Sequence, residues 1–558
     1  MMRYCKAYKN SEIRKFYASH SQAVPVLLES EGISFLWDDF MVRKSPLKHE
    51  EVVCEHVTEE WKDFCKNQLS FCIPEKTSLQ EAPMVHAQSL SAGNTFIPFT
   101  SGQRWLIEEL TCTGDFFSNV PLLQLCMQKM SIRELEQVLL YLFQYHDALR
   151  SKLTYKNKQW QQFIVASDDV LPATWICLSR LSASEQMILL KSIAHEMQRQ
   201  INTLQGFLWH FSFCEVDETH GYILWILNHF ITDAMSNQIL LQDFHTLHNQ
   251  MLQGKTLKLP KQKTRLREWA ERMTSYLDSP EAQQEIHAYW SRLPWELIKP
   301  IPLDSPAGMT LDPLTSRPGY GTCASSCNYY FSLAPAQTQL LLSTAASLHV
   351  QLLDMLLAAM AQTIASWSDS NVISLFVQDN ARFTMFKDVS LLHTVGFIAH
   401  ARRLLFDLRT ATSAKEALEL VKSQLEQAPN HGRSLDWFLR QESVPEDLKH
   451  IPWSDVYFNF GGKSATGLKQ DSLSSFMLEY PAHYRYHILL CEACIVKDRL
   501  EIKWEYSMDT HREATIAKFA GYFLEILCNF RADYALQAVG EKPTSERNTT
   551  SWKNSITR

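Results

Sequence analysis

The segment 228–234 (NHFITDA) contains the residues whose types and spacing are best suited to chemistry. His229 comes directly after a continuous apolar run, 222–227 (YILWIL), and Asp233 follows four residues later. Imidazole is the side chain that moves protons most readily near neutral pH, and a nearby carboxylate can fix the turn or orient the ring. The residues alone leave two interpretations open, a proton-transfer group in a cleft and a hydrogen-bonded structural histidine.

The elements that position this segment follow from the hydrophobic pattern. The run 222–227 predicts a strand that is covered on both faces, and 236–247 shows helical spacing. The same patterns predict further helices at 131–149, 264–277, 280–293, 335–348, 352–367, 414–427 and 515–530, and strands at 331–333, 372–377, 404–408, 456–460, 486–495 and 500–506. This mixture indicates an α/β (α+β) protein.

The pattern also predicts how the chain is divided. Two lobes of similar kind are expected at 93–265 and 266–535. Before them, 1–92 forms an N-terminal extension of unknown role that ends in a polar linker. The polar tail at 536–558 is expected to be disordered.

Composition excludes several classes of protein. The 558 residues carry a formal net charge of −7, whereas a nucleic-acid or anionic-membrane binder needs a basic surface. The first residues lack the apolar core of a signal peptide, and the most apolar helical stretch, 352–367, is too short and too interrupted to span a bilayer. With 13 scattered cysteines, these features predict a cytoplasmic protein that binds neither nucleic acid nor membrane.

Other sequence signals are weaker. Cys491 and Cys494 form a lone CxxC inside a predicted strand, and Cys323 and Cys327 have no partnering histidine nearby. Zinc sites of this type need a second pair of ligands. The sequence also lacks the phosphate-binding, dinucleotide-binding, nucleophile-elbow and zinc-protease motifs. No metal or cofactor is therefore expected to be bound by this chain.

Segment 228–234 resembles the HHxxxDG active-site motif of the condensation-domain superfamily of nonribosomal peptide synthetases. The resemblance continues along the chain in family order, and several motifs are most similar to the epimerization branch. These motifs are FTSGQRWL at 99–106, YHDALR at 145–150, REWAERM at 267–273, HTVGF at 393–397, the helix ending in PNHG at 414–432 and VYFNFG at 456–461.

The resemblance implies two chloramphenicol-acetyltransferase-like lobes in a V-shaped pseudo-dimer. It gives His229 the position of the catalytic second histidine, and Asn228 that of the first. In condensation His229 would position or deprotonate the attacking amine, and in epimerization it would exchange the α-proton. Asp233 would have a structural, orienting role by pairing with an arginine that the sequence does not identify. The implied partners are acyl or peptidyl carrier proteins, whose phosphopantetheine carries the substrate, and a separate adenylation enzyme.

One departure from the family pattern separates the branches. Gln378 in QDNAR stands where epimerization domains have the Glu of EGHGR, and the resemblance makes that Glu the second proton-transfer group of the branch. A carboxamide does not titrate near pH 7, and losing general acid–base assistance costs roughly 10²- to 10⁴-fold in rate. The sequence therefore favours an acyltransferase that forms an amide or ester with His229 as the base or positioning group. Epimerization by a route without the Glu, and a catalytically silent module that docks carrier proteins, stay open as alternatives.

Three smaller features of the sequence bear on the family resemblance. Arg402 and Arg403 follow the HTVGF motif, and they either contact a phosphopantetheine phosphate or form a solvated pair. Ala234 replaces the motif's glycine, so the loop loses its most permissive residue. Segment 32–34 (GIS) bears a faint similarity to the modified serine of a carrier protein.

Overall fold

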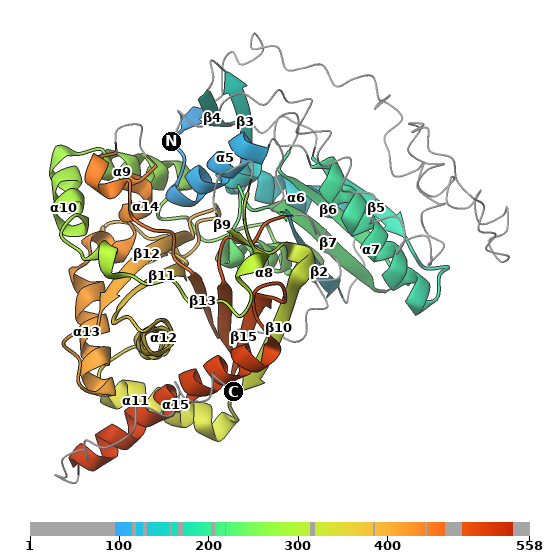
Figure 1. Cartoon of the computed structure of the whole chain (residues 1–558). Coiled ribbons are helices and arrows are strands. Elements are labelled where there is room, and N and C mark those ends of the chain that lie inside the picture. The colour runs from blue at the N-terminus through green and yellow to red at the C-terminus, as the bar shows by residue number, and fades with distance from the viewer. Residues whose placement is uncertain are drawn as a thin grey trace. The chain divides into compact units, whose positions relative to one another are not determined.

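The computed structural model describes residues 95–538, except for 114–118, 127–130, 157–158, 166–170, 202–206, 218, 313–317, 383–384, 441–443 and 464–482. The N-terminal extension predicted at 1–92, the carrier-like segment 32–34 and most of the predicted tail lie outside the described residues. Figure 1 shows the arrangement of helices and strands.

The described residues form two compact units that are interleaved in sequence. The first comprises 95–279 and Asn380–His400, and the second comprises Pro280–Asp379, 401–463 and 483–538. The sequence predicts a single boundary near 265, whereas the chain leaves the first unit near 279 and later returns to it. It returns because the segment Asn380–His400 makes hydrogen bonds to residues of the first unit, such as Asp233 and Thr264.

The first unit contains a four-stranded sheet with the order β2-β7-β6-β5. Its strands are β2 (Asn119–Cys126), β5 (Ala173–Cys177), β6 (Trp209–Glu215) and β7 (Gly221–Asn228), and the β5–β6 pair is parallel. Helix α7 (Ala183–Gln200) covers one face of this sheet (Figure 1). The core between them includes Leu190, Leu224 and Ile226. On the other face, Phe211 of β6 stacks on Phe244 of α8 (Ala234–Leu252), with ring centroids 5.4 Å apart. Because both faces are covered, β7 is apolar along most of its length.

Smaller elements complete the first unit. A three-stranded antiparallel sheet has the order β1-β4-β3, formed by Thr95–Ile97, Gln159–Ile164 and Ser151–Lys156. The remaining helices are α5 (Ser101–Thr113), α6 (Ile132–Tyr145), the 3₁₀ turn Asp147–Arg150 and α9 (Leu266–Leu277). Ser131 and Glu134 form a capping box that fixes the start of α6.

The second unit contains a six-stranded sheet with the order β10-β15-β14-β13-β11-β12. Its strands are β10 (Ser326–Ser332), β11 (Val372–Asp379), β12 (His400–Asp407), β13 (Val456–Lys463), β14 (Leu489–Val496) and β15 (Arg499–Ser507). Helices α11 (Pro335–Ser347), α12 (Leu352–Ser368), α13 (Ala414–Gln427) and α15 (Glu513–Ala538) gather on one side of this sheet (Figure 1). The unit also contains α10 (Pro280–Trp290), α14 (Leu435–Phe438), several 3₁₀ turns and the small hairpin β8 (Met309–Leu311) and β9 (Pro318–Tyr320).

The strand register shows which side chains lie side by side on each face of the six-stranded sheet. One lateral row consists of Val377, Phe458, Cys491 and Trp504, and all four are fully buried. Trp504 packs edge-on against Phe519 and Phe523 of α15. The next row, one residue along each strand, consists of Gln378, Asn459, Glu492 and Lys503, which are half-buried. Because side chains alternate across a strand, this polar row lies on the opposite face of the sheet from the buried apolar row.

The mixed α/β fold class predicted from the sequence is confirmed. The helices predicted at 352–367 and 414–427 and the strand at 222–227 lie at α12, α13 and β7, within a few residues at each end. Strands β2 to β6 were not predicted, and in β4 the glutamines interrupt the apolar pattern of a strand. Of the helices in the described chain, none is individually long and apolar enough to cross a membrane, and α11 with α12 would qualify only as a pair bent by 99°.

Candidate active site

His229 lies immediately after β7, in the tight turn that leads into α8. Its Nδ1 is 3.1 Å from the backbone oxygen of Thr232. A carbonyl oxygen only accepts hydrogen bonds, so Nδ1 carries the proton and Nε2 of the neutral ring has a free lone pair. Burial lowers the pKa of His229, while the hydrogen bond to Thr232 and the charge of Asp233 act in the opposite direction. The ring is thus held as a neutral imidazole whose Nε2 can accept a proton.

The carboxylate of Asp233 holds this turn in place by accepting hydrogen bonds from several segments. Its Oδ1 accepts hydrogen bonds from the backbone N–H of Ser236 and from Nη2 of Arg382, both at 2.8 Å. Its Oδ2 accepts from the backbone N–H groups of Ile398 (3.0 Å) and Ala399 (2.9 Å). The side chains of Asp233 and Arg382 are only 2% and 1% exposed. Arg382 is therefore the arginine that the sequence does not identify, and the carboxylate both caps α8 and joins three segments.

Ser236 strengthens the same junction. Its hydroxyl donates to the backbone oxygen of Gly396 (2.9 Å) and lies 2.9 Å from Nη2 of Arg382. Phe397, the residue after Gly396, places its ring centroid 5.5 Å from that of His229. A Cβ on Gly396 would lie 2.6 Å from a methyl group of Leu266, so any larger residue there would require the Leu266 side chain to move. The HTVGF segment thus packs directly on the histidine turn.

The opening motif also supports the turn. Nε2 of Gln103 donates to the backbone oxygen of Phe230 at 2.8 Å, and the Thr100 hydroxyl donates to the oxygen of Phe397 at 2.6 Å. No role was predicted for these two residues, although both lie in the FTSGQRWL motif. The signal available in the sequence was the residue type of Gln103, because a buried glutamine needs hydrogen-bond partners for its amide group.

Asn228, at the position of the family's first histidine, is fully buried. Its Oδ1 accepts from the backbone N–H of Phe230, and its Nδ2 donates to Asn119 Oδ1, both at 2.9 Å. Asn119 is its direct partner in the β2–β7 register. Asn228 therefore shapes the turn from inside the core.

Gln378 lies near the end of β11 in the second unit. Its Oε1 accepts a 2.7 Å hydrogen bond from the hydroxyl of Tyr457 on β13. Burial, with a contribution from the charge of Glu492, raises the pKa of Tyr457, so that hydroxyl keeps its proton. Tyr457 belongs to the VYFNFG motif but was not predicted as a site residue.

The two arginines after the HTVGF motif are buried, at 6% and 5% exposure. Arg402 pairs with Asp379 at 3.3 Å, and Arg403 pairs with Asp436 at 3.2 Å. The guanidinium of Arg403 also lies 4.9 Å from the ring centroid of Trp453. The solvated pair expected from the sequence is wrong, because each charge is neutralised inside the second unit, where a phosphate of a partner would not reach it.

The cysteine pair lacks the geometry of a metal site. Cys491 and Cys494 lie on β14 as predicted, and both are buried. They are three residues apart, so their side chains point to opposite faces of the sheet. Burial raises the pKa of Cys494 to about 11. Within the described ranges, no three His, Cys, Asp or Glu side chains are grouped to hold a metal ion.

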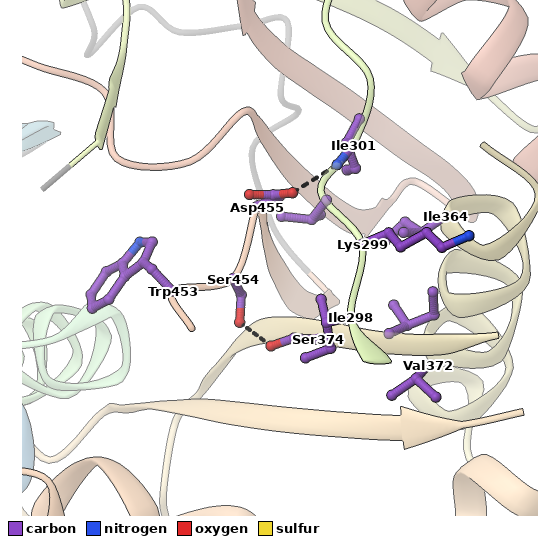
Figure 2. Close-up of a pocket in the computed structure, with 11 residues that line it drawn as sticks. Ile298, Lys299, Ile301, Ile364, Val372, Ser374, Trp453, Ser454 and Asp455 are labelled. Atoms are coloured by element: carbon purple, nitrogen blue, oxygen red, sulfur yellow. Dashed lines mark hydrogen bonds between the residues drawn. The ribbon is translucent and has the colours of Figure 1, made fainter. Parts of the chain in front are cut away.

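Figure 2 shows a small cavity in the second unit that contains none of the predicted site residues. Asp455 accepts a hydrogen bond from the backbone N–H of Ile301 (2.9 Å). The hydroxyls of Ser374 and Ser454 form a hydrogen bond with each other. Burial raises the pKa of Asp455. The space holds roughly one water molecule, so it is a packing defect beside β11 and β13 and too small for a substrate.

Solved structures share this fold. Among solved structures, the epimerization domain from the third module of tyrocidine synthetase B matches with a TM-score of 0.66 and 21% identity, over 78% of this chain and 96% of that one. The condensation domain of the enacyloxin polyketide synthase, described as mediating chain release, matches with a TM-score of 0.57 and 15% identity, over 90% and 93% of the two chains. At these identities the likeness shows the fold, which is that of condensation and epimerization domains.

Sequence relatives are much longer than this chain. It is 26% identical over 442 residues to a linear gramicidin synthase protein of Brevibacillus parabrevis, covering 77% of this chain and 6% of that protein. It is 28% identical over 441 residues to chondramide synthase of Chondromyces crocatus, covering 77% and 11%. The family model described as "Condensation domain" matches residues 94–551. Because that match spans most of the sequence and both described units, the chain belongs to the condensation-domain family.

Proposed function

We propose that this protein transfers an acyl or aminoacyl group from the phosphopantetheine thioester of a carrier protein to an amine or hydroxyl, forming an amide or ester. The observation that supports this proposal most directly is the protonation state of His229. Its Nδ1–H is bound to the Thr232 carbonyl and its pKa is lowered, so Nε2 is an unprotonated base at neutral pH. That is the form a general base needs.

The proposed reaction balances without a cofactor. The nitrogen or oxygen of the acceptor attacks the thioester carbonyl while His229 Nε2 removes its proton. The new C–N or C–O bond forms, the C–S bond breaks, and the departing pantetheine thiolate receives the proton from the imidazolium. Asp233 has no direct part in these steps and acts by holding the turn through Arg382, Ile398 and Ala399.

The state of Gln378 disfavours epimerization as the main activity. Two-base proton exchange at Cα needs a titratable group on each face of that carbon, and an amide has none near neutral pH. In addition, the amide oxygen already accepts a hydrogen bond from Tyr457. The proposal therefore places the chain among acyl-transferring members of its family, with carrier proteins and a separate adenylation enzyme as cytoplasmic partners.

The test compares two substitutions of His229. His229→Ala removes the ring, whereas His229→Asn keeps a donor close to the position of Nδ1 but has no base. The probes are carrier proteins loaded with alanyl or octanoyl thioesters, with small amines and alcohols as acceptors and product formation read by mass spectrometry. We expect both variants to lose roughly 10²- to 10⁴-fold in rate. His229→Asn should retain the thermal stability of the wild type, and His287→Ala, on the surface of the second unit, serves as the control.

Each alternative gives a different result in the same assay. Full turnover by His229→Asn would refute the base role. Deuterium wash-in at Cα of the alanyl carrier, without product, would identify epimerization instead. Carrier binding with no turnover of any thioester by the wild type would identify a silent docking module.

A further inference from the structure

We propose that the segment 255–267, called the basic strip below, is a docking surface for an acidic face of a protein partner. The strip follows α8 and reaches the first turn of α9, so it lies wholly in the first unit, which also contains His229. Under the proposed function the partner is the carrier protein, and only this identification rests on the proposed function.

The first observation is the charge of the strip. Between Asp243 and Glu268 the chain has no aspartate or glutamate but six lysines or arginines, although acidic residues outnumber basic ones in the whole sequence. Arg265 pairs with Asp147 at 3.5 Å, and Arg267 pairs with Glu271 at 3.6 Å. The four lysines are not ion-paired with any residue that the structure describes. All six cations are exposed, and they are Lys255, Lys258, Lys261, Lys263, Arg265 and Arg267.

The second observation is that the strip is held in place, although it has no regular secondary structure before α9. The side-chain amide of Gln250 accepts from the backbone N–H of Lys258 (2.7 Å) and donates to the backbone oxygen of the same residue (2.9 Å). Leu259 is buried, and its N–H donates to the Tyr141 hydroxyl at 3.2 Å. Because these contacts fix the backbone, less conformational entropy is lost when a partner binds.

The third observation is the alternation of exposed cations with inward-facing residues from 261 to 267. The inward-facing Gln262 donates to the backbone oxygen of His393 at 3.3 Å. The Thr264 hydroxyl accepts from the backbone N–H of Ser390 (3.1 Å), and its backbone oxygen accepts from the Thr394 hydroxyl (2.7 Å). The inner side of the strip is thus bound to the HTVGF segment, which packs on the histidine turn. A partner on the outer side would be seated on the unit that holds the candidate base.

The side chains around these cations favour a protein over other anionic partners. Binding of single-stranded nucleic acid combines cations with aromatic rings on which bases stack, and the strip contains no aromatic residue. Binding to a membrane surface combines cations with exposed apolar side chains, and none of the strip's leucines is exposed. Separate lysine charges on a polar surface complement the carboxylates of an acidic protein face.

The experiment measures the rate of association with an acidic carrier protein whose attachment serine is replaced by alanine. Without phosphopantetheine, neither substrate nor catalysis takes part. Lys261→Glu/Lys263→Glu reverses two exposed charges of the strip. We expect its association rate constant to fall roughly 10- to 100-fold in about 20 mM salt, because complementary charges steer the encounter. The difference should largely disappear in about 0.5 M salt, which screens charges over a few ångströms.

The matched control is Arg180→Glu/Lys191→Glu, which changes the net charge by the same amount. These residues lie just before and on α7, on the opposite face of the four-stranded sheet from α8. The control should associate within about threefold of the wild type, since its charges are remote from the strip. A carrier with its surface acids changed to lysine should bind Lys261→Glu/Lys263→Glu faster than the wild type. Thermal unfolding should be unchanged in that variant, because both lysines are exposed and not ion-paired.

The inference is overturned if Lys261→Glu/Lys263→Glu associates within about twofold of the wild type in low salt, or if the control slows equally. It is also overturned if phosphatidylserine vesicles or single-stranded RNA bind the wild type more tightly than the carrier does, or if the variant changes the oligomeric state. His229→Asn should dock like the wild type. Full activity in His229→Asn would refute the proposed function and leave the docking result standing.

Discussion

Replacing Asp233 by asparagine tests whether one buried carboxylate holds the histidine turn. The carboxylate accepts four hydrogen bonds, from Ser236, Arg382, Ile398 and Ala399. In Asp233→Asn one oxygen becomes an NH₂ group that faces donors, and the guanidinium of Arg382, 1% exposed, keeps its charge without a counter-ion. Removing one partner of a buried ion pair costs about 3–5 kcal/mol. With a Tm change of about 2–4 °C per kcal/mol for 150–250 residues, the Tm should fall by roughly 6–20 °C.

The assay is a double-mutant cycle on the free energy of unfolding, measured by denaturant titration. Arg382→Gln alone should also destabilise the protein, because it leaves the Asp233 carboxylate buried without its cation. The double variant Asp233→Asn/Arg382→Gln removes both charges and should be considerably more stable than the sum of the two single losses predicts. Additive effects, or an Asp233→Asn variant within about 0.5 kcal/mol of the wild type, would refute this account of the turn.

Three further predictions concern pH, the turn and metal. The base form of His229 is neutral and its pKa is lowered, so kcat/KM should fall on the acid side with a midpoint below about 6.5, and a midpoint at or above that value contradicts the assignment. Asn228→His, which restores the family residue, should lower stability by about 1–3 kcal/mol in thermal unfolding, because imidazole overfills the buried site beside Asn119; an equally stable variant argues against this packing. A zinc chelator should leave the Tm unchanged, since Cys491 and Cys494 face opposite sides of β14, and a drop would reveal a bound metal.

The sequence was sufficient for the parts of the site that depend on local pattern. His229 follows an apolar strand and precedes a helix in both the prediction and the structure. The reason is that the hydrophobic periodicity of a strand or a helix is set by residues that are close together in the sequence. The order of the motifs also led to the correct family. The same reasoning missed Tyr457 and Gln103, whose hydrogen-bond partners are 79 and 127 residues away in the sequence.

The sequence by itself therefore determined the family, many of the helices and strands, and the position of the candidate base in the chain. Only the tertiary structure decided which arginine pairs with Asp233, how Gln378 is turned, and that Arg402 and Arg403 are buried in ion pairs. The physical reason is that periodicity and turn chemistry act over a few neighbouring residues, whereas burial and charge pairing depend on segments brought together by packing. An aspartate at the start of a helix is readable as a cap, but an arginine 149 residues later becomes its partner only in the folded protein.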